Sequence, residues 1–384
     1  MSRIESWAVG SLPFFYTCQP NPTNAAQGLP DTLPFELEFD ADHGLVRQRW
    51  SPEVDAALNA GYLHGSEISG MMDAEGIGRS YAEDFLAFIE RGGESLAGKR
   101  ILEIGCGTGY LLARLRDQGA DVIGIEPGEQ GKDGARRHGV PIVHGFFPHP
   151  EVDAKFDIII AYGVLEHIVD PVQFVRNIAN HLSTDGVAYL AVPNCEPYLR
   201  RGDISCLLHE HWSYFTADAL GSVLARAGLA AEVSNSGFGG SLYSRCHLGP
   251  DAQDTVRQPD GMLFRQFRDL AGAAAARMEG LLTDGDGEVG IYVPGRVVNL
   301  LSTLDATVLK RLRFFDDNPR MTGQFFPGVP VKLESFEGLV KRPPSRLFVA
   351  TRSFQDAIVA KLRASNVNIP TVGWSDVFEA GLGK

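Results

Sequence analysis

Residues 100–110 constrain the fold of this 384-residue chain more than any other segment. Residues 101–104 have the pattern of a short buried strand, Gly105, Gly107 and Gly109 follow it, and an amphipathic helical pattern occupies residues 111–118. Glycine has no Cβ atom, so it permits positive φ and lets the backbone approach a ligand closely. A strand, a tight glycine turn and a helix in this order predict the start of a doubly wound α/β sheet that binds a ligand at the turn.

Two carboxylates flank this turn. Glu103 precedes it, and Glu126 ends a second predicted strand, 17 residues after Gly109. A carboxylate at that place can accept hydrogen bonds from both hydroxyls of a ribose. The Gly-x-Gly-x-Gly spacing differs from the Gly-x-Gly-x-x-Gly of dinucleotide sites, and with both carboxylates it resembles the first motif and acidic loop of class I S-adenosylmethionine-dependent methyltransferases. The resemblance implies S-adenosylmethionine as the cofactor, held by Glu103, Gly105, Gly107, Gly109 and Glu126.

The net charge and the cysteine pattern argue against several other classes of protein. A net charge of −13 argues against a nucleic-acid partner, because phosphate backbones are bound through an excess of Lys and Arg. The five cysteines are scattered, with no Cys-x-x-Cys pair, which fits free thiols in a reducing compartment. The sequence has no signal-peptide pattern and no apolar run of about 18 residues. We therefore expect a cytoplasmic protein without a membrane partner, either a monomer or a homodimer.

The remaining pattern divides the chain into three parts. Residues 1–80 are rich in Pro, Gly, Asn and Asp and predict a small irregular lobe. Residues 81–249 alternate between strand and helix, as a class I methyltransferase domain should, and end in an antiparallel pair at 231–234 and 242–247. Residues 250–384 predict a second, smaller α/β domain that follows a polar boundary at 250–260. Its expected elements are a long helix at 262–282, strands at 290–293, 313–316 and 346–350, and helices at 297–304 and 354–364.

The segment Leu208–Thr216 contains the leading candidates for proton transfer. His209, Glu210 and His211 follow the last parallel strand, at the edge where open α/β sheets bind ligands. Histidine can act as a base near neutral pH, and a carboxylate can orient a ring or bind a substrate hydroxyl. Two histidines so spaced could also bind a metal, but no third ligand follows at a suitable spacing, so we expect no metal site. A hydrogen-bonded turn that caps the next helix is the structural alternative.

A second group follows the fourth strand. Tyr162 begins a loop that ends in Glu166 and His167, and this loop should line the methyl donor, with His167 as a further catalytic candidate. Phe146 and Phe147 follow the third strand and could pack against adenine. Both aromatic side chains are equally compatible with a place in the core.

Several segments together resemble the C-methyltransferases of deoxysugar biosynthesis. They are His209–Phe215, Gly239–Leu242, Phe315–Pro319 and Gly323–Gly328, in addition to the glycine turn. The resemblance implies methylation of carbon 3 of a nucleotide-linked 4-keto-deoxysugar. Loss of a proton beside the ketone would give an enolate that attacks the sulfonium methyl group. His211 would then be the base, Glu210 and His209 would position the substrate, and the C-terminal domain would clamp the nucleotide.

The chain also departs from that family. Where the family has zinc-binding cysteines, residues 39–47 read Phe-Asp-Ala-Asp-His-Gly-Leu-Val-Arg, so we expect no structural zinc. Leu208 replaces a tyrosine, and residues 290–297 differ from the family's glycine-rich pattern. An O- or N-methyltransferase of another small natural product therefore stays open. A binding or scaffold protein with an inactive methyltransferase fold is a further alternative, against which the intact cofactor residues argue.

Overall fold

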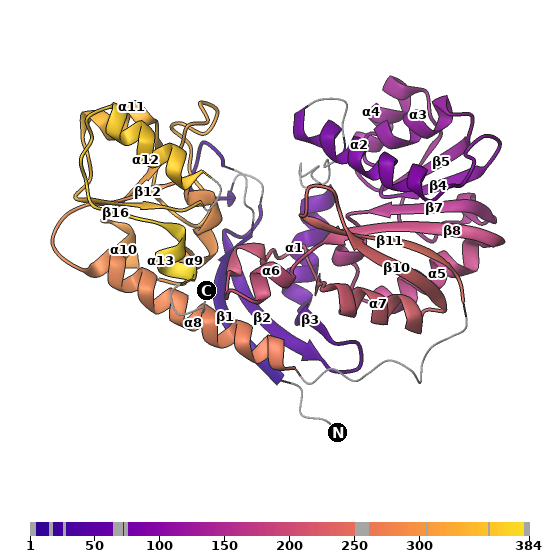
Figure 1. The fold of residues 1–384 in the computed structure, drawn as a ribbon, viewed down its shortest axis with the longest axis horizontal. Coiled ribbons are helices and arrows are strands. Elements are labelled where there is room, and N and C mark those ends of the chain that lie inside the picture. Colours follow the sequence, from indigo (N-terminus) through magenta and orange to yellow (C-terminus); the bar gives the residue numbers. More distant parts are fainter. Residues whose placement is uncertain are drawn as a thin grey trace. The chain divides into compact units, whose positions relative to one another are not determined.

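The computed structural model describes residues 5–14, 18–25, 28–63, 72, 76–249, 261–304, 306–351 and 354–379 (Figure 1). The chain forms two compact units, each built from segments that are separate in the sequence. Unit 1 includes Phe39–Glu196 and Glu210–Asp260, and unit 2 includes Glu5–Glu38, Pro197–His209 and Gly261–Lys384. The polar boundary expected at residues 250–260 lies outside the described residues.

Unit 1 contains a seven-stranded sheet in the order β10-β11-β8-β7-β4-β5-β6. Five strands are parallel, and β11 and β10 add the antiparallel pair expected at one edge. The strands are β4 (Arg100–Ile104), β5 (Asp121–Glu126), β6 (Ile142–His144), β7 (Phe156–Tyr162), β8 (Leu182–Pro193), β10 (Leu229–Asn235) and β11 (Ser241–Leu248). The doubly wound α/β prediction is confirmed. Because β4 pairs with both β5 and β7, the connections run in opposite directions from β4, where such sheets bind ligands.

Helices cover both faces of this sheet. Phe85 and Ile89, four residues apart on one helix, pack in the core on one face, while Phe174 and Ile178 do so on the other. Residues four apart share one side of a helix, so a single apolar stripe attaches each helix to the sheet. The helices of this unit are α1 (Pro52–Leu63), α2 (Gly76–Arg91), α3 (Tyr110–Asp117), α4 (Glu129–His138), α5 (Pro171–His181) and α7 (Ala217–Arg226).

The N-terminal segment is more regular than its composition predicts. It forms β1 (Glu5–Pro13), β2 (Thr32–Asp40) and β3 (Leu45–Gln48) as well as α1. In β2 the alternate residues Leu33, Phe35 and Leu37 are buried, which is the period of a strand with one covered face. In unit 1, β3 pairs antiparallel with the two-residue strand β9 (Ser213–Tyr214). This pairing attaches residues 45–48 to the segment that follows Glu210 and His211.

Unit 2 contains a five-stranded parallel sheet in the order β14-β13-β12-β15-β16. Its strands are β12 (Val289–Tyr292), β13 (Leu312–Phe315), β14 (Leu333–Glu334), β15 (Arg346–Val349) and β16 (Thr371–Val372). Its helices are α8 (Met262–Thr283), α9 (Val298–Ser302), α10 (Ala306–Leu309), α11 (Phe336–Lys341), α12 (Gln355–Ala364) and α13 (Trp374–Phe378), and α6 (Glu196–Leu199) begins at its border. The second α/β region is therefore confirmed.

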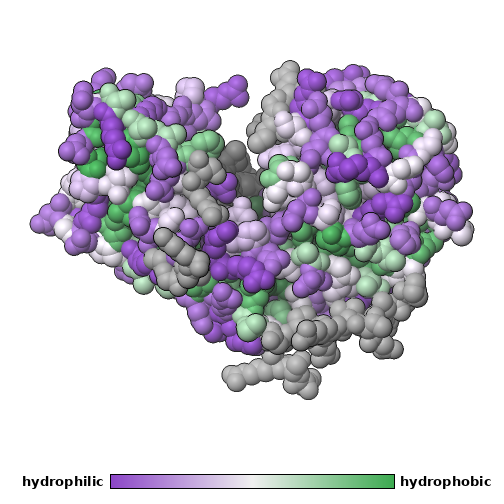
Figure 2. Space-filling view, viewed as in Figure 1, coloured by the Kyte–Doolittle hydropathy of each residue, from purple (hydrophilic) through white to green (hydrophobic). Residues whose placement is uncertain are grey.

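One face of the protein surface is mainly hydrophilic. Figure 2 shows this face, on which hydrophilic residues predominate and hydrophobic ones are scattered. Among the described residues, no helix combines the length and apolar character that crossing a membrane requires.

Candidate functional site

The glycine turn after β4 has the backbone that its sequence predicts. Gly105, Gly107 and Gly109 have φ of 68°, 52° and 72°, in the left-handed region that other residues rarely adopt. A Cβ atom on Gly105 would lie 2.6 Å from Val164, and one on Gly109 would lie 2.9 Å from Val140. The left-handed conformation therefore requires all three glycines, and the close packing of the turn requires Gly105 and Gly109.

Glu126 lies against this turn, at the carboxyl end of β5. Its side chain is buried, and its two oxygens accept hydrogen bonds from the backbone N–H groups of Gly107 (2.9 Å) and Gly128 (2.8 Å). Burial raises the pKa of this carboxyl, although both hydrogen bonds act to lower it. The carboxylate predicted to bind the ribose thus shares one edge of the sheet with the glycine turn.

Glu103 is buried on the neighbouring strand β4, opposite Gly124 of β5. Burial, together with the nearby charge of Glu126, raises its pKa well above the usual range. Its Oε2 atom has no hydrogen-bond partner among the residues that the structure describes. A buried carboxyl with unused hydrogen-bonding capacity at a ligand-binding edge is a candidate for contact with the cofactor.

Helix α4 holds the turn through glycines that the sequence analysis missed. A Cβ atom on Gly134 would lie 2.0 Å from the carbonyl oxygen of Thr108, and one on Gly131 would lie 2.8 Å from Cγ of Glu126. Only glycine at these two places lets α4 approach both the turn and the carboxylate. Two glycines three residues apart inside a helix were the available signal, since each costs about 1 kcal/mol of helix stability relative to alanine.

The three predicted aromatic residues lie in different surroundings. Phe146 is largely exposed, whereas Phe147 packs edge-on against Phe174 and His181 at ring distances of 5.8 and 4.9 Å. Tyr162 ends β7 and packs edge-on against Phe85 at 5.0 Å, in the core on the α2 face. Burial raises the pKa of Tyr162 to about 12. Of these three side chains, Phe146 is the one with an open ring face.

The fold brings His211 next to Glu166 and His167, from which it is more than 40 residues away in the sequence. Glu166 and His167 end the short 3-10 helix η3 (Leu165–His167), and His211 comes from the later His-Glu-His segment. One ligating atom from each of the three lies within 4.8 Å of the other two. The rings of His167 and His211 meet edge-on at 4.8 Å, and His167 Nε2 lies 4.0 Å from Oε1 of Glu166.

Backbone hydrogen bonds hold this cluster in place. The ring nitrogen Nδ1 of His167 is 2.9 Å from the carbonyl oxygen of Glu210, and the Trp212 N–H donates to the carbonyl of Glu166 at 2.8 Å. A carbonyl can only accept, so Nδ1 of His167 carries the proton and Nε2 keeps its lone pair. These bonds fix η3 against the segment that carries Glu210 and His211.

Burial controls the ionisation of the cluster. It raises the pKa of Glu166 to about 8 and that of Glu210 also to about 8, with the charge of Glu210 adding to the effect at Glu166. It lowers the pKa of His167 to about 4 and that of His211 well below its usual range. At neutral pH both imidazoles are therefore neutral.

His209 is separated from the other two members of its motif. It belongs to unit 2, where its Nε2 lies 3.2 Å from the carbonyl oxygen of Leu12 and its ring packs against Phe35 (4.9 Å) and Phe14 (6.0 Å). Only 1% of it is exposed, and burial lowers its pKa to about 4. Its surroundings are those of a packed core residue, while Glu210 and His211 belong to unit 1.

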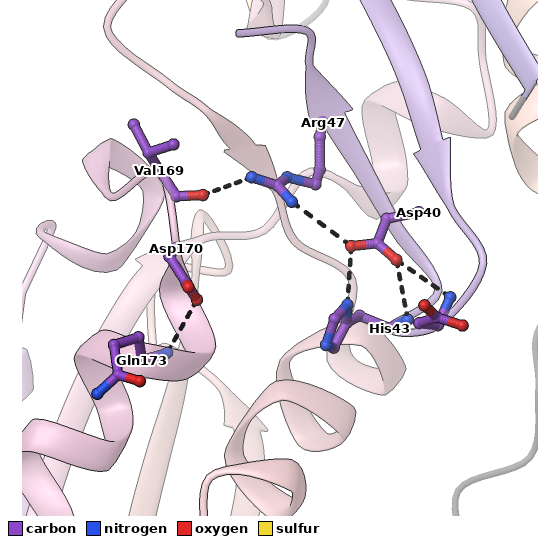
Figure 3. Close-up of polar contacts among 7 residues, drawn as sticks. Asp40, His43, Arg47, Val169, Asp170 and Gln173 are labelled. Atoms are coloured by element: carbon purple, nitrogen blue, oxygen red, sulfur yellow. Dashed lines mark hydrogen bonds and ion pairs between the residues drawn. The ribbon is translucent and has the colours of Figure 1, made fainter.

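A charged group supports the loop after η3. Arg47 of β3 donates to the carbonyl of Val169 and pairs with Asp40, which also pairs with His43 at 2.7 Å (Figure 3). Asp40 and His43 occupy the positions where the sugar C-methyltransferases resembled above have cysteines. Arg47 thus ties β3 to the loop that follows Glu166 and His167 of the cluster.

Comparison with known proteins identifies the domain. Residues 77–232 match the family model described as a methyltransferase domain. These residues form a methyltransferase domain. The match includes the glycine turn, Glu126, and the Glu166–His167 and His211 segments, so the candidate site lies wholly inside it.

The curated relatives are similar to this chain over part of its length. A ubiquinone biosynthesis O-methyltransferase of Marinobacter nauticus is 32% identical over 113 residues, which cover 27% of this chain and 48% of that protein. The protein of the same name from Bordetella avium is 32% identical over 120 residues, covering 29% and 50%. The chain thus spans about half the length of the curated relatives it matches, and carbon methylation of a sugar stays a prediction.

Two solved structures are similar to part of this chain. A DhpI–SAH complex is 21% identical, with a TM-score of 0.38 over 51% of this chain and 97% of that one. An S-adenosylmethionine-dependent methyltransferase from Mesorhizobium loti is 16% identical, with a TM-score of 0.37 over 42% and 97%.

Proposed function

We propose that this protein is an S-adenosylmethionine-dependent methyltransferase. The observation that carries the proposal is the edge of the unit 1 sheet, where three positive-φ glycines and the buried Glu126 meet inside the methyltransferase domain. Open backbone at the turn suits the methionine part of the donor, and the Glu126 carboxylate suits its ribose hydroxyls. Glu103 and Phe146 complete the donor site in this proposal.

The acceptor that we propose is a nucleotide-linked 4-keto-deoxysugar, methylated at carbon. The ketone acidifies the adjacent C–H bond, a base takes the proton, and the resulting enolate carbon attacks the methyl group while S-adenosylhomocysteine leaves. His211 is the proposed base, with Glu210 and His167 beside it. The support is their position after β7 and β8, at the edge proposed for the donor, and the edge-on contact of the His211 and His167 rings at 4.8 Å.

Unit 2 is the proposed binding unit for the nucleotide. Its parallel sheet changes direction between β12 and β15, because β13 and β14 lie on one side of β12 and β15 and β16 on the other. Open parallel sheets bind ligands beside the carboxyl ends of their strands at such a point. Tyr292, Asp316 and Asp317 lie at these ends, and Tyr292 donates to Asp317 at 2.7 Å.

O-methylation is the second candidate, and the names of the curated relatives favour it. The same donor site would serve, but the nucleophile would be a hydroxyl group, and no carbon-bound proton would be lost. The two candidate reactions therefore differ in whether the acceptor loses a carbon-bound proton, which can be measured.

The experiment combines product analysis with proton exchange. The protein is incubated with methyl-labelled S-adenosylmethionine and a panel of nucleotide-linked 4-keto sugars, and products are identified by mass and NMR. We expect a new C–CH₃ bond, and exchange of the α-proton into deuterated water that wild-type protein catalyses and His211→Asn loses. General-base catalysis is worth roughly 10²–10⁴ in rate, so turnover of this variant should fall by about that factor. A methyl ether product would reject carbon methylation, and near-normal turnover of His211→Asn would remove His211 from the mechanism.

A further inference from the structure

From the cluster formed by Glu166, His167 and His211 we infer that the methyltransferase domain binds one divalent transition-metal ion of the zinc type. The three residues offer two imidazole nitrogens and one carboxylate oxygen, all within 4.8 Å of one another. This inference concerns metal binding alone, so it does not depend on the identity of the methyl acceptor. The sequence spacing did not predict the site, because the partners of His211 lie more than 40 residues earlier in the chain.

The donor set decides the class of metal. Magnesium and calcium prefer oxygen ligands alone, whereas imidazole nitrogen suits zinc, cobalt, nickel, copper and iron. Two histidines with one glutamate form a known catalytic zinc set, in which a fourth position is left for water or substrate. His167 keeps 24% of its side chain exposed, so the cluster has an open side through which an ion can enter.

His167 is oriented as a metal ligand should be. A metal-bound histidine usually donates its other ring N–H to a carbonyl or carboxylate, which fixes the tautomer and aims the free nitrogen. Nδ1 of His167 makes such a bond to the carbonyl of Glu210 at 2.9 Å. Its Nε2 therefore has the available lone pair, and this is the atom that lies 4.0 Å from the carboxylate of Glu166.

Glu166 supplies a second, independent observation. Only 2% of it is exposed, yet its Oε2 atom has no hydrogen-bond partner among the described residues. Glu210 precedes His211 in the chain, and its Oε2 atom is also buried without a hydrogen-bond partner among the described residues. A buried carboxyl oxygen without a hydrogen-bond partner costs free energy of roughly 1–3 kcal/mol, which a bound cation would offset.

The geometry is close to that of an occupied site. Ligand bonds of about 2.0–2.2 Å place neighbouring ligand atoms roughly 3.4 Å apart around a tetrahedral zinc ion. The present separations reach 4.8 Å, so closing the site takes a movement of about 1 Å by side chains. With an ion bound, the coordinating nitrogen of His211 would have no free lone pair, so His211 acts as the proposed base only in the metal-free protein.

The test is a titration of chelator-treated, full-length protein with Co²⁺, followed by competition with Zn²⁺. We expect visible Co²⁺ absorption bands that saturate at one equivalent and disappear when Zn²⁺ is added. Glu166→Gln and His167→Gln should each weaken binding by at least about 100-fold, since each removes a direct ligand. Absence of the bands in wild-type protein, or wild-type affinity in Glu166→Gln, would overturn the inference.

Two control variants separate this outcome from misfolding and from failure of the proposed function. His181 is also partly buried, its Nδ1 lies 2.7 Å from a backbone carbonyl, and its Nε2 lies 3.8 Å from Asp153, but it is outside the cluster. His181→Gln should bind Co²⁺ as wild-type protein does. Glu126→Ala should keep the metal and lose S-adenosylmethionine, whereas Glu166→Gln should lose the metal and keep S-adenosylmethionine. Loss of both ligands in Glu166→Gln would indicate misfolding of that variant, and His167→Gln would then decide. Loss of the metal with retained S-adenosylmethionine binding in His167→Gln would support the inference, and retained metal binding in His167→Gln would overturn it.

Discussion

Replacement of Gly134 by alanine tests whether α4 holds the glycine turn. The added Cβ atom would lie 2.0 Å from the carbonyl oxygen of Thr108, about 1 Å short of the 3.0 Å below which real Cβ contacts are almost never found. The atom that it meets is backbone, so no side chain can rotate away. Helix α4 and the turn must therefore separate by about 1 Å, and the turn is the part that would bind S-adenosylmethionine.

Gly221→Ala in α7 is the matched control, because nothing lies within 4 Å of its added Cβ atom. Both changes gain about 1 kcal/mol of helix propensity, so the difference between the two variants isolates the clash. Overpacking of this kind costs roughly 1–3 kcal/mol, and a backbone contact belongs at the upper end. We expect the free energy of unfolding of Gly134→Ala to be about 3 kcal/mol below that of Gly221→Ala.

Thermal and denaturant unfolding measure that difference. At about 2–4 °C per kcal/mol for a domain of 150–250 residues, the midpoints should differ by roughly 6–12 °C. Displacement of the turn should also weaken donor binding by at least about tenfold, which corresponds to 1.4 kcal/mol. If Gly134→Ala matches Gly221→Ala in both stability and donor affinity, α4 does not position the turn.

Three further predictions concern the supports of the two units. In unit 2, Arg313 is buried, and two of its nitrogens pair with Glu334 at 2.7 and 2.6 Å. Glu334→Gln should therefore lower the free energy of unfolding, measured by chemical denaturation, by about 3 kcal/mol. A loss below about 0.5 kcal/mol would show that the pair does not stabilise the fold. In unit 1, burial raises the pKa of Glu94, but hydrogen bonds from Tyr189 and Arg245 outweigh it and hold this pKa below its usual value of 4.5. These hydrogen bonds to Glu94 contribute about 1 kcal/mol to the free energy of unfolding, because the groups are partly solvated. This stabilisation is present above pH 4.5 and is lost as pH falls through the lowered pKa of Glu94. The stabilities of Glu94→Gln and wild type should therefore converge under acid. A stability gap that widened as pH fell would contradict the sign. Arg47→Met should loosen the loop after η3 and raise its amide exchange, and unchanged exchange at residues 169–173 would refute the role given to this side chain.

The fold followed from the sequence because its signals are local. Alternation of strand and helix, together with the apolar stripes on α2 and α5, specifies a doubly wound sheet with two covered faces. The glycine turn and Glu126 adjoin for the same reason, since the carboxyl ends of neighbouring parallel strands meet at one edge. Each of these features depends on residues that are close in the chain or in adjacent strands.

The cluster could not be predicted in the same way. His209 and His211 are two residues apart, yet His209 packs in unit 2 against Phe14 and Phe35, while His211 meets His167 in unit 1. Spacing along a loop does not determine which side chains converge, because the convergence is set by long-range backbone bonds such as that from Trp212 to Glu166. The strands in the N-terminal segment were missed because their Pro and Gly content outweighed the period-two pattern of β2.

Calorimetric titration of the protein with S-adenosylmethionine tests the central claim most directly. The account predicts saturable binding at one site per chain, and a loss of at least about 100-fold in Glu126→Ala, since two charge-assisted hydrogen bonds of roughly 1.5–3 kcal/mol each are removed. Glu129→Ala is the control, because this nearby carboxylate is exposed and pairs with Lys132 on the surface of α4. The account predicts wild-type affinity for that control. Absence of binding in the wild type, or equal affinity in Glu126→Ala and Glu129→Ala, would contradict the assignment of this edge as the methyl-donor site.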